Sequence, residues 1–212
     1  MKKTILVLLF AVSFTAAWAQ RDPAYVRVIS ERTDKNMSGL GITDPQAAER
    51  VKEVIMNHYF TLNDIHNERD SLRQVQKDHP ESGITAESIS SLVDSKLYRH
   101  HFAFISALMV DLDEEQIEGV KNALTYNVLN VTYEAHLDMI PSLTEAQKKQ
   151  IYAWLYEARE LAIDGGSSNE KHGIFGKYKG RINNYLSREG YNLTREREAW
   201  NERIKQRNAG TR

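Results

Sequence analysis

The apolar residues between Asp44 and Lys77 recur at intervals of three and four, and this spacing constrains the fold more than any other feature. A stripe with that period is typical of an amphipathic helix, whereas a half-buried strand alternates every second residue. His79-Pro80 ends the pattern. The sequence therefore predicts one long helix, whose inward stripe is Val51, Val54, Ile55, His58, Leu62, Ile65, Arg69 and Leu72.

The rest of the chain repeats this helical pattern. All four prolines stand where a helix would begin or end. The segment 125–131 is the least helical part, and a short helix is expected between it and Pro141. In the segment 144–164, Ile151, Leu155 and Leu161 are expected to face inward. The other predicted helices cover 25–40, 85–104, 113–124, 144–164, 167–188 and 195–207.

These segments predict an all-α fold, an irregular bundle of six or seven helices with two long antiparallel ones. The highly charged end of the chain, 195–212, is expected to form a loosely docked terminal helix. The remainder is expected to pack as one domain, because the length fits a single core.

The first nineteen residues resemble a cleavable secretory signal. Lys2 and Lys3 precede a ten-residue apolar run, and Ala17 and Ala19 supply the small positions of a cleavage site. The run is too short to cross a bilayer, which takes about 20 residues. We therefore expect a signal peptide at 1–19, a helical domain at 20–212, a periplasmic or secreted product, and no membrane anchor after cleavage.

The net charge and the cysteine content exclude several classes of function and site. Cleavage removes two of the 28 basic residues, which leaves 26 against 29 acidic residues and a net charge of −3. Nucleic-acid binding usually needs a strongly basic face, so we expect no nucleic-acid partner. The chain has no cysteine, which excludes disulfides, thiolate zinc sites and cysteine nucleophiles. No motif indicates a cofactor.

Three helix starts share one pattern: an apolar residue, Thr or Asp, two variable residues and Gln. They begin at Ile42, Leu112 and Leu143. In a capping box, the first polar side chain accepts from the third amide of the helix and the Gln reaches back. The same pattern resembles the LTxxQ motifs of the periplasmic Spy/CpxP chaperone family, although the copy at Leu112 has Asp for Thr. That family's basic concave surface is missing from this near-neutral chain.

Nearly the whole mature chain resembles a family other than the Spy/CpxP chaperones. Four segments carry it: 24–32, 41–67 with the core HYFTLNDIH, 125–143, and 165–191, which reads GGSSNEKHGIFGKYKGRINNYLSREGY. They are similar to an exported helical family of polysaccharide-degrading bacteria, a domain of unknown function for which sugar binding has been suggested. The resemblance implies the fold and export, and a carbohydrate ligand as an expectation.

The segment 166–191 is unusual in its glycines. Gly173, Gly176 and Gly180 fall on one helix face, and each costs a helix about 1 kcal/mol relative to Ala. Two explanations remain open: a close helix crossing, or a ligand that lies against this face. For a ligand such as an acidic plant polysaccharide fragment, the candidate donors and stacking rings are Lys171, His172, Phe175, Lys177, Tyr178, Arg181 and Asn184, with Lys179 adding positive charge.

A set of polar side chains lies on the otherwise apolar face of the long helix. Tyr59, Asn63 and His66 are spaced by four and three, which indicates either a buried polar network or the lining of a site. A metal site is not expected, because His58 and His66 are eight apart and face different directions. His100 and His101 likewise point about 100° apart on a helix.

Three functions follow. The first is an exported, non-enzymatic carbohydrate-binding protein or accessory protein of polysaccharide utilisation. The second is a Spy-like holdase. The third is a glycan-active lyase or hydrolase that uses His66, His172 or Tyr178.

Overall fold

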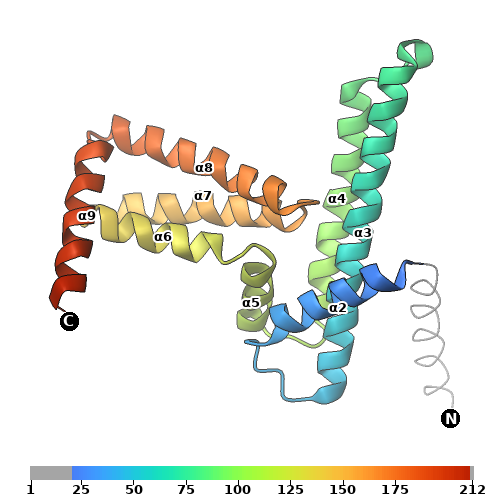
Figure 1. Ribbon diagram of the computed structural model, residues 1–212, viewed down its shortest axis with the longest axis horizontal. Helices are drawn as coiled ribbons and strands as arrows, with labels where there is room; N and C mark the ends of the chain where they lie inside the picture. The colour runs from blue at the N-terminus through green and yellow to red at the C-terminus, as the bar shows by residue number, and fades with distance from the viewer. Residues whose placement is uncertain (1–20, 211–212) are drawn as a thin grey trace.

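The computed structural model describes residues 21–210, and this part of the chain is helical with no strand (Figure 1). The all-α prediction is confirmed, with eight α-helices instead of six or seven, because the short helix before Pro141 and the terminal helix both form. The predicted signal peptide lies outside the described residues. The helices are α2 (Pro23–Met37), α3 (Pro45–Asp78), α4 (Ala86–Leu108), α5 (Glu114–Leu124), α6 (Val128–Met139), α7 (Glu145–Ile163), α8 (Ser168–Arg188) and α9 (Leu193–Gly210).

Helices α3 and α4 form the two long antiparallel helices that the apolar spacing predicts (Figure 1). A short 3-10 helix, η1 (Pro80–Ser82), turns the chain between them, and Gly83 there has a φ of 73°, which favours glycine. Ile65, Ile89 and Val93 pack between the two helices. Helix α2 lies across the base of this hairpin, where Ile29 contacts Phe60.

Two of the three repeated helix starts are capping boxes. At α5 the pair is Asp113 and Gln116, and at α7 it is Thr144 and Gln147. The prediction of a box at α3 is wrong: Pro45 takes the first helical position, and Asp44 caps the helix by accepting from the amide of Gln46. Proline is favoured at that position because its missing N–H would be unpaired there anyway.

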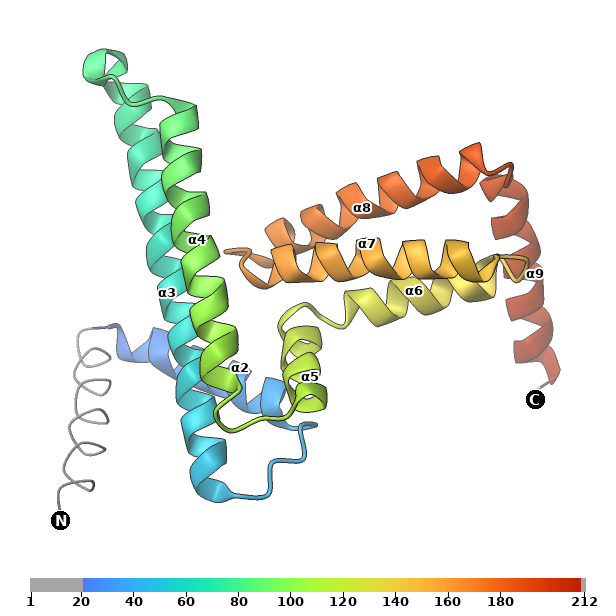
Figure 2. The ribbon, with the colours of Figure 1, turned by 180° about the vertical axis from the view of Figure 1, so that it is seen from behind.

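Helices α6, α7 and α8 form a second unit, which extends away from the hairpin (Figure 2). Its core is built from Leu129, Ile151, Leu155, Ile182 and Leu186, all fully buried. The prediction that Leu161 faces inward is wrong. This residue is 53% exposed, because α7 is covered by α6 and α8 on its other sides.

Helix α9 runs across the far end of α6–α8 (Figure 1) and is held there by polar contacts. The indole of Trp200 donates to Asp138 at 2.6 Å, and Arg207 forms an ion pair with the same carboxylate. Arg203 donates to the carbonyls of Asp138 and Met139 at the end of α6. None of the α9 side chains that the structure describes is buried. Within residues 21–210, no helix has the length and apolar character needed to span a membrane.

Candidate functional site

The two units meet where the C-terminal end of α7 reaches the middle of the α3–α4 hairpin, a region that we call the junction. Ile163, at the end of α7, is fully buried in the core that α3, α4 and α5 share. Beside it, Nε2 of His66 donates to the carbonyl of Asp164 at 2.9 Å. This approach depends on Gly166, since a Cβ there would lie 2.5 Å from the His66 ring. Gly166 thus lets the α7–α8 turn approach α3 closely.

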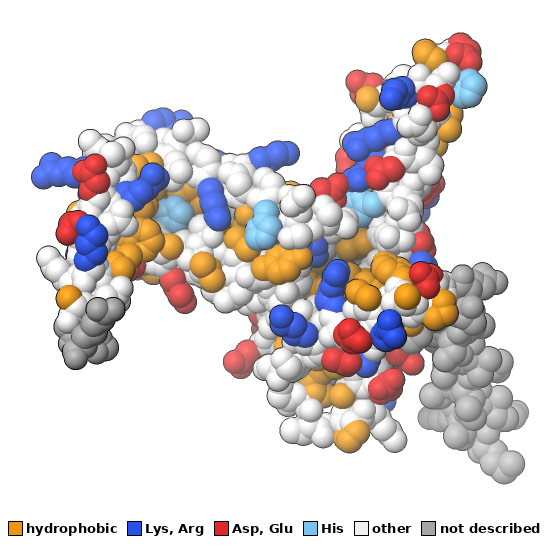
Figure 3. All heavy atoms as spheres, in the orientation of Figure 1, with side chains coloured by type: hydrophobic (Ala, Val, Ile, Leu, Met, Phe, Trp, Pro, Cys, Tyr) orange, Lys and Arg blue, Asp and Glu red, His pale blue; other side chains and the backbone are white. Residues whose placement is uncertain are grey.

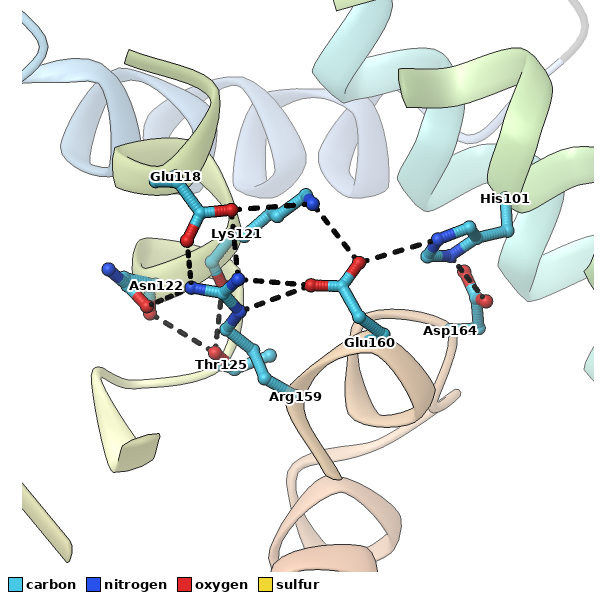
Figure 4. A network of polar contacts seen from close by, with 8 residues as sticks. All are labelled: His101, Glu118, Lys121, Asn122, Thr125, Arg159, Glu160 and Asp164. Carbon is cyan, nitrogen blue, oxygen red and sulfur yellow. Dashed lines mark hydrogen bonds and ion pairs between the residues drawn. The ribbon is translucent and has the colours of Figure 1, made fainter. Parts of the chain in front are cut away.

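An ion network lines one side of the junction (Figure 4). Arg159 is 1% exposed and forms ion pairs with Glu118 at 2.7 Å and Glu160 at 3.0 Å. Lys121 reaches Glu160 at 3.1 Å. His101 lies between Glu160, at 3.5 Å, and Asp164, at 3.0 Å. The three cations therefore face three carboxylates, which offsets the cost of burying them.

This network keeps His101 and Glu160 charged at neutral pH. Hydrogen bonds to Asp164 and Glu160 raise the pKa of His101 to about 9. Burial alone raises the pKa of Glu160, but hydrogen bonds from His101, Lys121 and Arg159 outweigh burial and lower this pKa to about 2. Neither group exchanges a proton near neutral pH, so the network supplies fixed charges.

A second set of polar groups lies deeper in the junction. Nδ1 of His58 is 2.9 Å from Nε2 of His100, and the His58 ring stacks on Phe104 with centroids 3.9 Å apart. Lys171 donates to the carbonyl of Leu124 at 2.9 Å, and burial lowers its pKa to about 8. Burial also lowers the pKa of His58 well below its usual value, and the neighbouring His100 and Lys171 add to this shift.

A groove opens on the surface directly above the ion network, between α4 and the end of α7, and we call it the α4–α7 groove. It has a volume of about 370 Å³. Tyr98 and Phe102 are 67% and 55% exposed, and their ring centroids are 4.9 Å apart. The groove thus combines exposed apolar walls with a charged floor. Its lining is Asp94, Leu97, Tyr98, His101, Phe102, Glu160, Leu161 and Asp164.

The sequence shows no local pattern that identifies this groove. The signal present on α4 is the aromatic pair Tyr98 and Phe102, one helical turn apart, with His101 on the same side. The partner side is formed by Leu161, which helical spacing assigned to the core. Because the groove arises from segments about 60 positions apart, no local pattern connects its two walls.

The structure places the predicted α8 residues in three different settings. Phe175 is 1% exposed in the core and cannot stack against a ligand, and Lys171 is buried in the junction. His172 is exposed and stacks on Tyr126, with centroids 5.3 Å apart. Tyr178 is partly buried against the core of α6–α8. Lys177, Arg181 and Asn184 share an exposed edge of α8 beside a shallow, open depression, which Gly180, Ser187 and Arg188 also line. Figure 3 shows Lys and Arg side chains spaced along the α8 side of this unit.

Contacts along this exposed edge restrain two side chains. Arg181 lies over the ring of Trp154 at 4.7 Å and forms an ion pair with Glu157 at 3.5 Å. Burial, followed by a hydrogen bond with Glu157, raises the pKa of Tyr178 to about 12. The close-crossing explanation of the glycines is wrong for the part of the chain that the structure describes, since a Cβ at Gly173, Gly176 or Gly180 would meet none of its atoms within 4 Å. Ligand binding along this edge stays a prediction.

The predicted polar stripe on α3 points in different directions. The hydroxyl of Tyr59 accepts from Asn36 on α2 at 2.9 Å, whereas His66 reaches the α7–α8 turn, and Asn63 between them is half-buried. The buried-network explanation therefore describes Tyr59 and His66, although they belong to different contacts. Across residues 21–210 no group of three His, Asp or Glu side chains is arranged to hold a metal ion.

The Gln residues of the repeated helix starts have partners within the fold. Gln116 donates to the carbonyl of Leu40 at 3.0 Å, which ties α5 to the end of α2. Gln147 accepts from the hydroxyl of Tyr191 at 2.9 Å. Capping and packing therefore account for the motif at both positions.

Similarity to a known family covers the same helical region of the chain. No curated protein matches the chain in sequence. A family model described as a protein of unknown function, DUF3826, matches residues 26–206. The match extends from α2 into α9 and includes the whole junction. The chain therefore belongs to the DUF3826 family.

Proposed function

We propose that the protein is an exported, non-enzymatic binding protein that takes a saccharide in the α4–α7 groove. The observation that carries this proposal is the exposed pair Tyr98 and Phe102 beside a floor of ionised side chains. A pyranose ring has an apolar C–H face and a rim of hydroxyls, so it fits an aromatic wall next to fixed polar groups. Binding sites generally combine apolar walls with a few such groups.

The protonation states of the floor favour binding over catalysis. A general acid or base works best when its pKa lies near the operating pH. The pKa of Glu160 is about 2 and that of His101 about 9, so neither group gives or takes a proton readily at neutral pH. Both instead stay ionised and paired within the network, and so give the floor of the groove a fixed charge pattern beneath a ligand.

The charge of the groove favours a neutral saccharide. Asp94, Glu160 and Asp164 stand against the single imidazolium of His101 among the lining residues. A uronate would meet repulsion there. The expected acidic glycan suits the exposed edge of α8 better, where Lys177, Arg181 and Arg188 border the shallow depression. This edge is the second candidate position for a glycan.

A thermal-shift panel tests the two positions together. Neutral and uronic-acid oligosaccharides are added to the wild-type protein, to Tyr98→Ala with Phe102→Ala, and to Lys177→Ala with Arg181→Ala. A ligand at about 100 times its Kd stabilises the fold by roughly 2.7 kcal/mol. We expect a neutral oligosaccharide to raise the melting temperature of the wild type and of the α8 variant. The groove variant should lose the shift.

Two outcomes contradict the proposal. One is a panel of plant and host glycans that leaves the wild-type melting temperature unchanged. The other is a shift that survives in the groove variant but disappears in the α8 variant, which would assign binding to the exposed edge of α8.

A further inference from the structure

The turn between α5 and α6 has a tyrosine where glycine is usual. The amide of Asn127 donates to the carbonyl of Asn122 at 2.8 Å, and the amide of Tyr126 donates to that of Ala123 at 3.3 Å. These two bonds form a Schellman motif, which usually places glycine at the position of Tyr126. Tyr126 has a φ of 57°, a left-handed conformation that strains any residue with a Cβ. The turn alone therefore does not explain the tyrosine.

The side chain of Tyr126 lies on the surface instead of filling the core. Its ring stacks on that of His172 in α8, with the centroids 5.3 Å and the planes 16° apart. Tyr126 is 53% exposed and His172 is exposed as well, so much of the tyrosine ring still faces solvent. Backbone strain is concentrated at functional sites in proteins. Here the strained turn presents a flat aromatic surface.

Two hydrogen-bond donors on α2 and α3 have no acceptor. The guanidinium of Arg32 lies over the ring of Tyr59, 5.6 Å from its centroid, and no carboxylate within residues 21–210 forms an ion pair with it. The hydroxyl of Tyr59 accepts from Asn36 at 2.9 Å. None of the described residues accepts the hydroxyl hydrogen of Tyr59. A carboxylate has two oxygens and could accept from both donors.

Electrostatic interactions link these donors to the aromatic surface. Burial raises the pKa of Tyr59, and both Arg32 and Tyr126 lie near enough to change it. Burial lowers the pKa of Lys171, the residue before His172, to about 8, and the charge of Arg32 adds to this shift. Helix α2 crosses α3 on the side away from α4 (Figures 1 and 2). The surface is therefore distinct from the α4–α7 groove, which α4 lines.

We propose that Arg32, Tyr59, Tyr126 and His172 form a second binding site, for a six-membered ring that bears a carboxylate, and we call it the Arg32 site. Arg32 and Tyr59 donate to the carboxylate, in charge-assisted hydrogen bonds. The ring lies flat against the exposed part of Tyr126. Uronic acids and aromatic acids share this chemistry. The inference goes beyond the proposed function and does not depend on it.

An NMR titration of the isotope-labelled full-length protein at pH 7.5 tests the site with three probes. They are trigalacturonate, its fully methyl-esterified form and benzoate. We expect at least one of the two carboxylates to bind and the ester to bind far more weakly, because the ester keeps the ring but lacks the charge. Binding of trigalacturonate alone supports a uronate ligand, and binding of benzoate alone supports an aromatic acid. The proposal would be overturned if neither carboxylate bound, or if the ester bound equally well.

The perturbed resonances locate the ligand. They should cluster at Arg32, at Tyr59 and at residues 125–127 and 171–172. Perturbations confined to the edge of α8 at 177–188, or to α4, would overturn the proposal. Failure of a neutral saccharide to bind in the α4–α7 groove would contradict the proposed function alone, since the Arg32 site is tested with other ligands and other resonances.

A matched pair of variants tests the guanidinium. Arg32→Gln should weaken the affinity for the bound carboxylate by about tenfold or more, because it removes a hydrogen bond to a charged group. Arg27→Gln removes the same charge from another exposed position of α2, about 140° around the helix, and should bind as the wild type does. Equal affinities of the two variants would overturn the proposal.

Tyr126→Gly tests the aromatic surface. Glycine relieves the left-handed strain of the turn, so we expect this variant to fold, as circular dichroism will show. Its affinity should fall by about three- to tenfold, the usual contribution of an aromatic contact. An affinity equal to that of the wild type would overturn the placement of the ligand ring on Tyr126.

Discussion

Gly166 lies against the ring of His66, so closely that a Cβ on Gly166 would be 2.5 Å from Cδ2 and 2.7 Å from Cγ of the imidazole. The ring is buried and donates to the carbonyl of Asp164. It cannot move away without losing that bond. The pair therefore sets how closely the α7–α8 turn approaches α3.

Gly166→Ala should destabilise the protein by about 1–3 kcal/mol, the usual cost of overpacking a fitted contact. Urea unfolding gives this difference as a lower midpoint. Gly176→Ala is the matched control, because no atom of the described residues lies within 4 Å of a Cβ at that position. It should stabilise α8 by about 0.5–1 kcal/mol, the helix preference of Ala over Gly. A Gly166→Ala protein with the same free energy of unfolding as the wild type would contradict the observed contact.

Arg159→Met should cost about 1–3 kcal/mol, because Glu118 and Glu160 lose their most buried partner but both keep Lys121. Chemical denaturation at pH 7 measures the loss. Arg181→Met removes an exposed ion pair with Glu157 and should change the free energy of unfolding by less than about 1 kcal/mol. Equal effects of the two substitutions would show that the ion network contributes little to the junction.

Deprotonation of His101 should lower the free energy of unfolding as the pH rises. Its pKa is raised from 6.5 to about 9, so its contribution is fully present below pH 6.5 and is lost as the pH rises through 9. Allowing for solvent screening, this loss is about 2 kcal/mol. His101→Gln should therefore flatten the fall in stability between pH 6.5 and 9.

Lys171 changes the pH dependence of the free energy of unfolding in the opposite direction to His101. Burial lowers its pKa from 10.5 to about 8, so stability from this group rises between pH 8 and 10.5. The comparison of the wild type with His101→Gln cancels this contribution, because both proteins contain Lys171. A difference between the two proteins that stays constant from pH 6 to 9 would refute the role of His101.

We expect the exported protein to lack its signal peptide. Cleavage after Ala19 would leave Gln20 as the first residue, and the intact mass of protein recovered from the periplasm or the medium should lack residues 1–19. A mass that retains Met1 to Ala19 would contradict processing at this site.

The helices could be predicted from local patterns, whereas the site could not. The period of the stripe through Val51 and Leu72 and the placement of the prolines depend only on neighbouring residues. The junction depends on contacts such as His66 with Asp164, 98 positions apart. The spacing of the α8 glycines also misleads, because it resembles a packing face although none of the segments within residues 21–210 packs there. Leu161 fits a helical stripe as well as Leu155 does, yet it lines the groove.

Chemical-shift mapping by NMR tests most directly whether the α4–α7 groove is the binding site. A neutral oligosaccharide selected by thermal shift is titrated into isotope-labelled wild-type protein at pH 7.5. We predict that the perturbed resonances cluster on α4 between Asp94 and Phe102 and on α7 between Glu160 and Asp164. Perturbations confined to residues 177–188 of α8, or no perturbation at saturating ligand, would contradict binding in the groove.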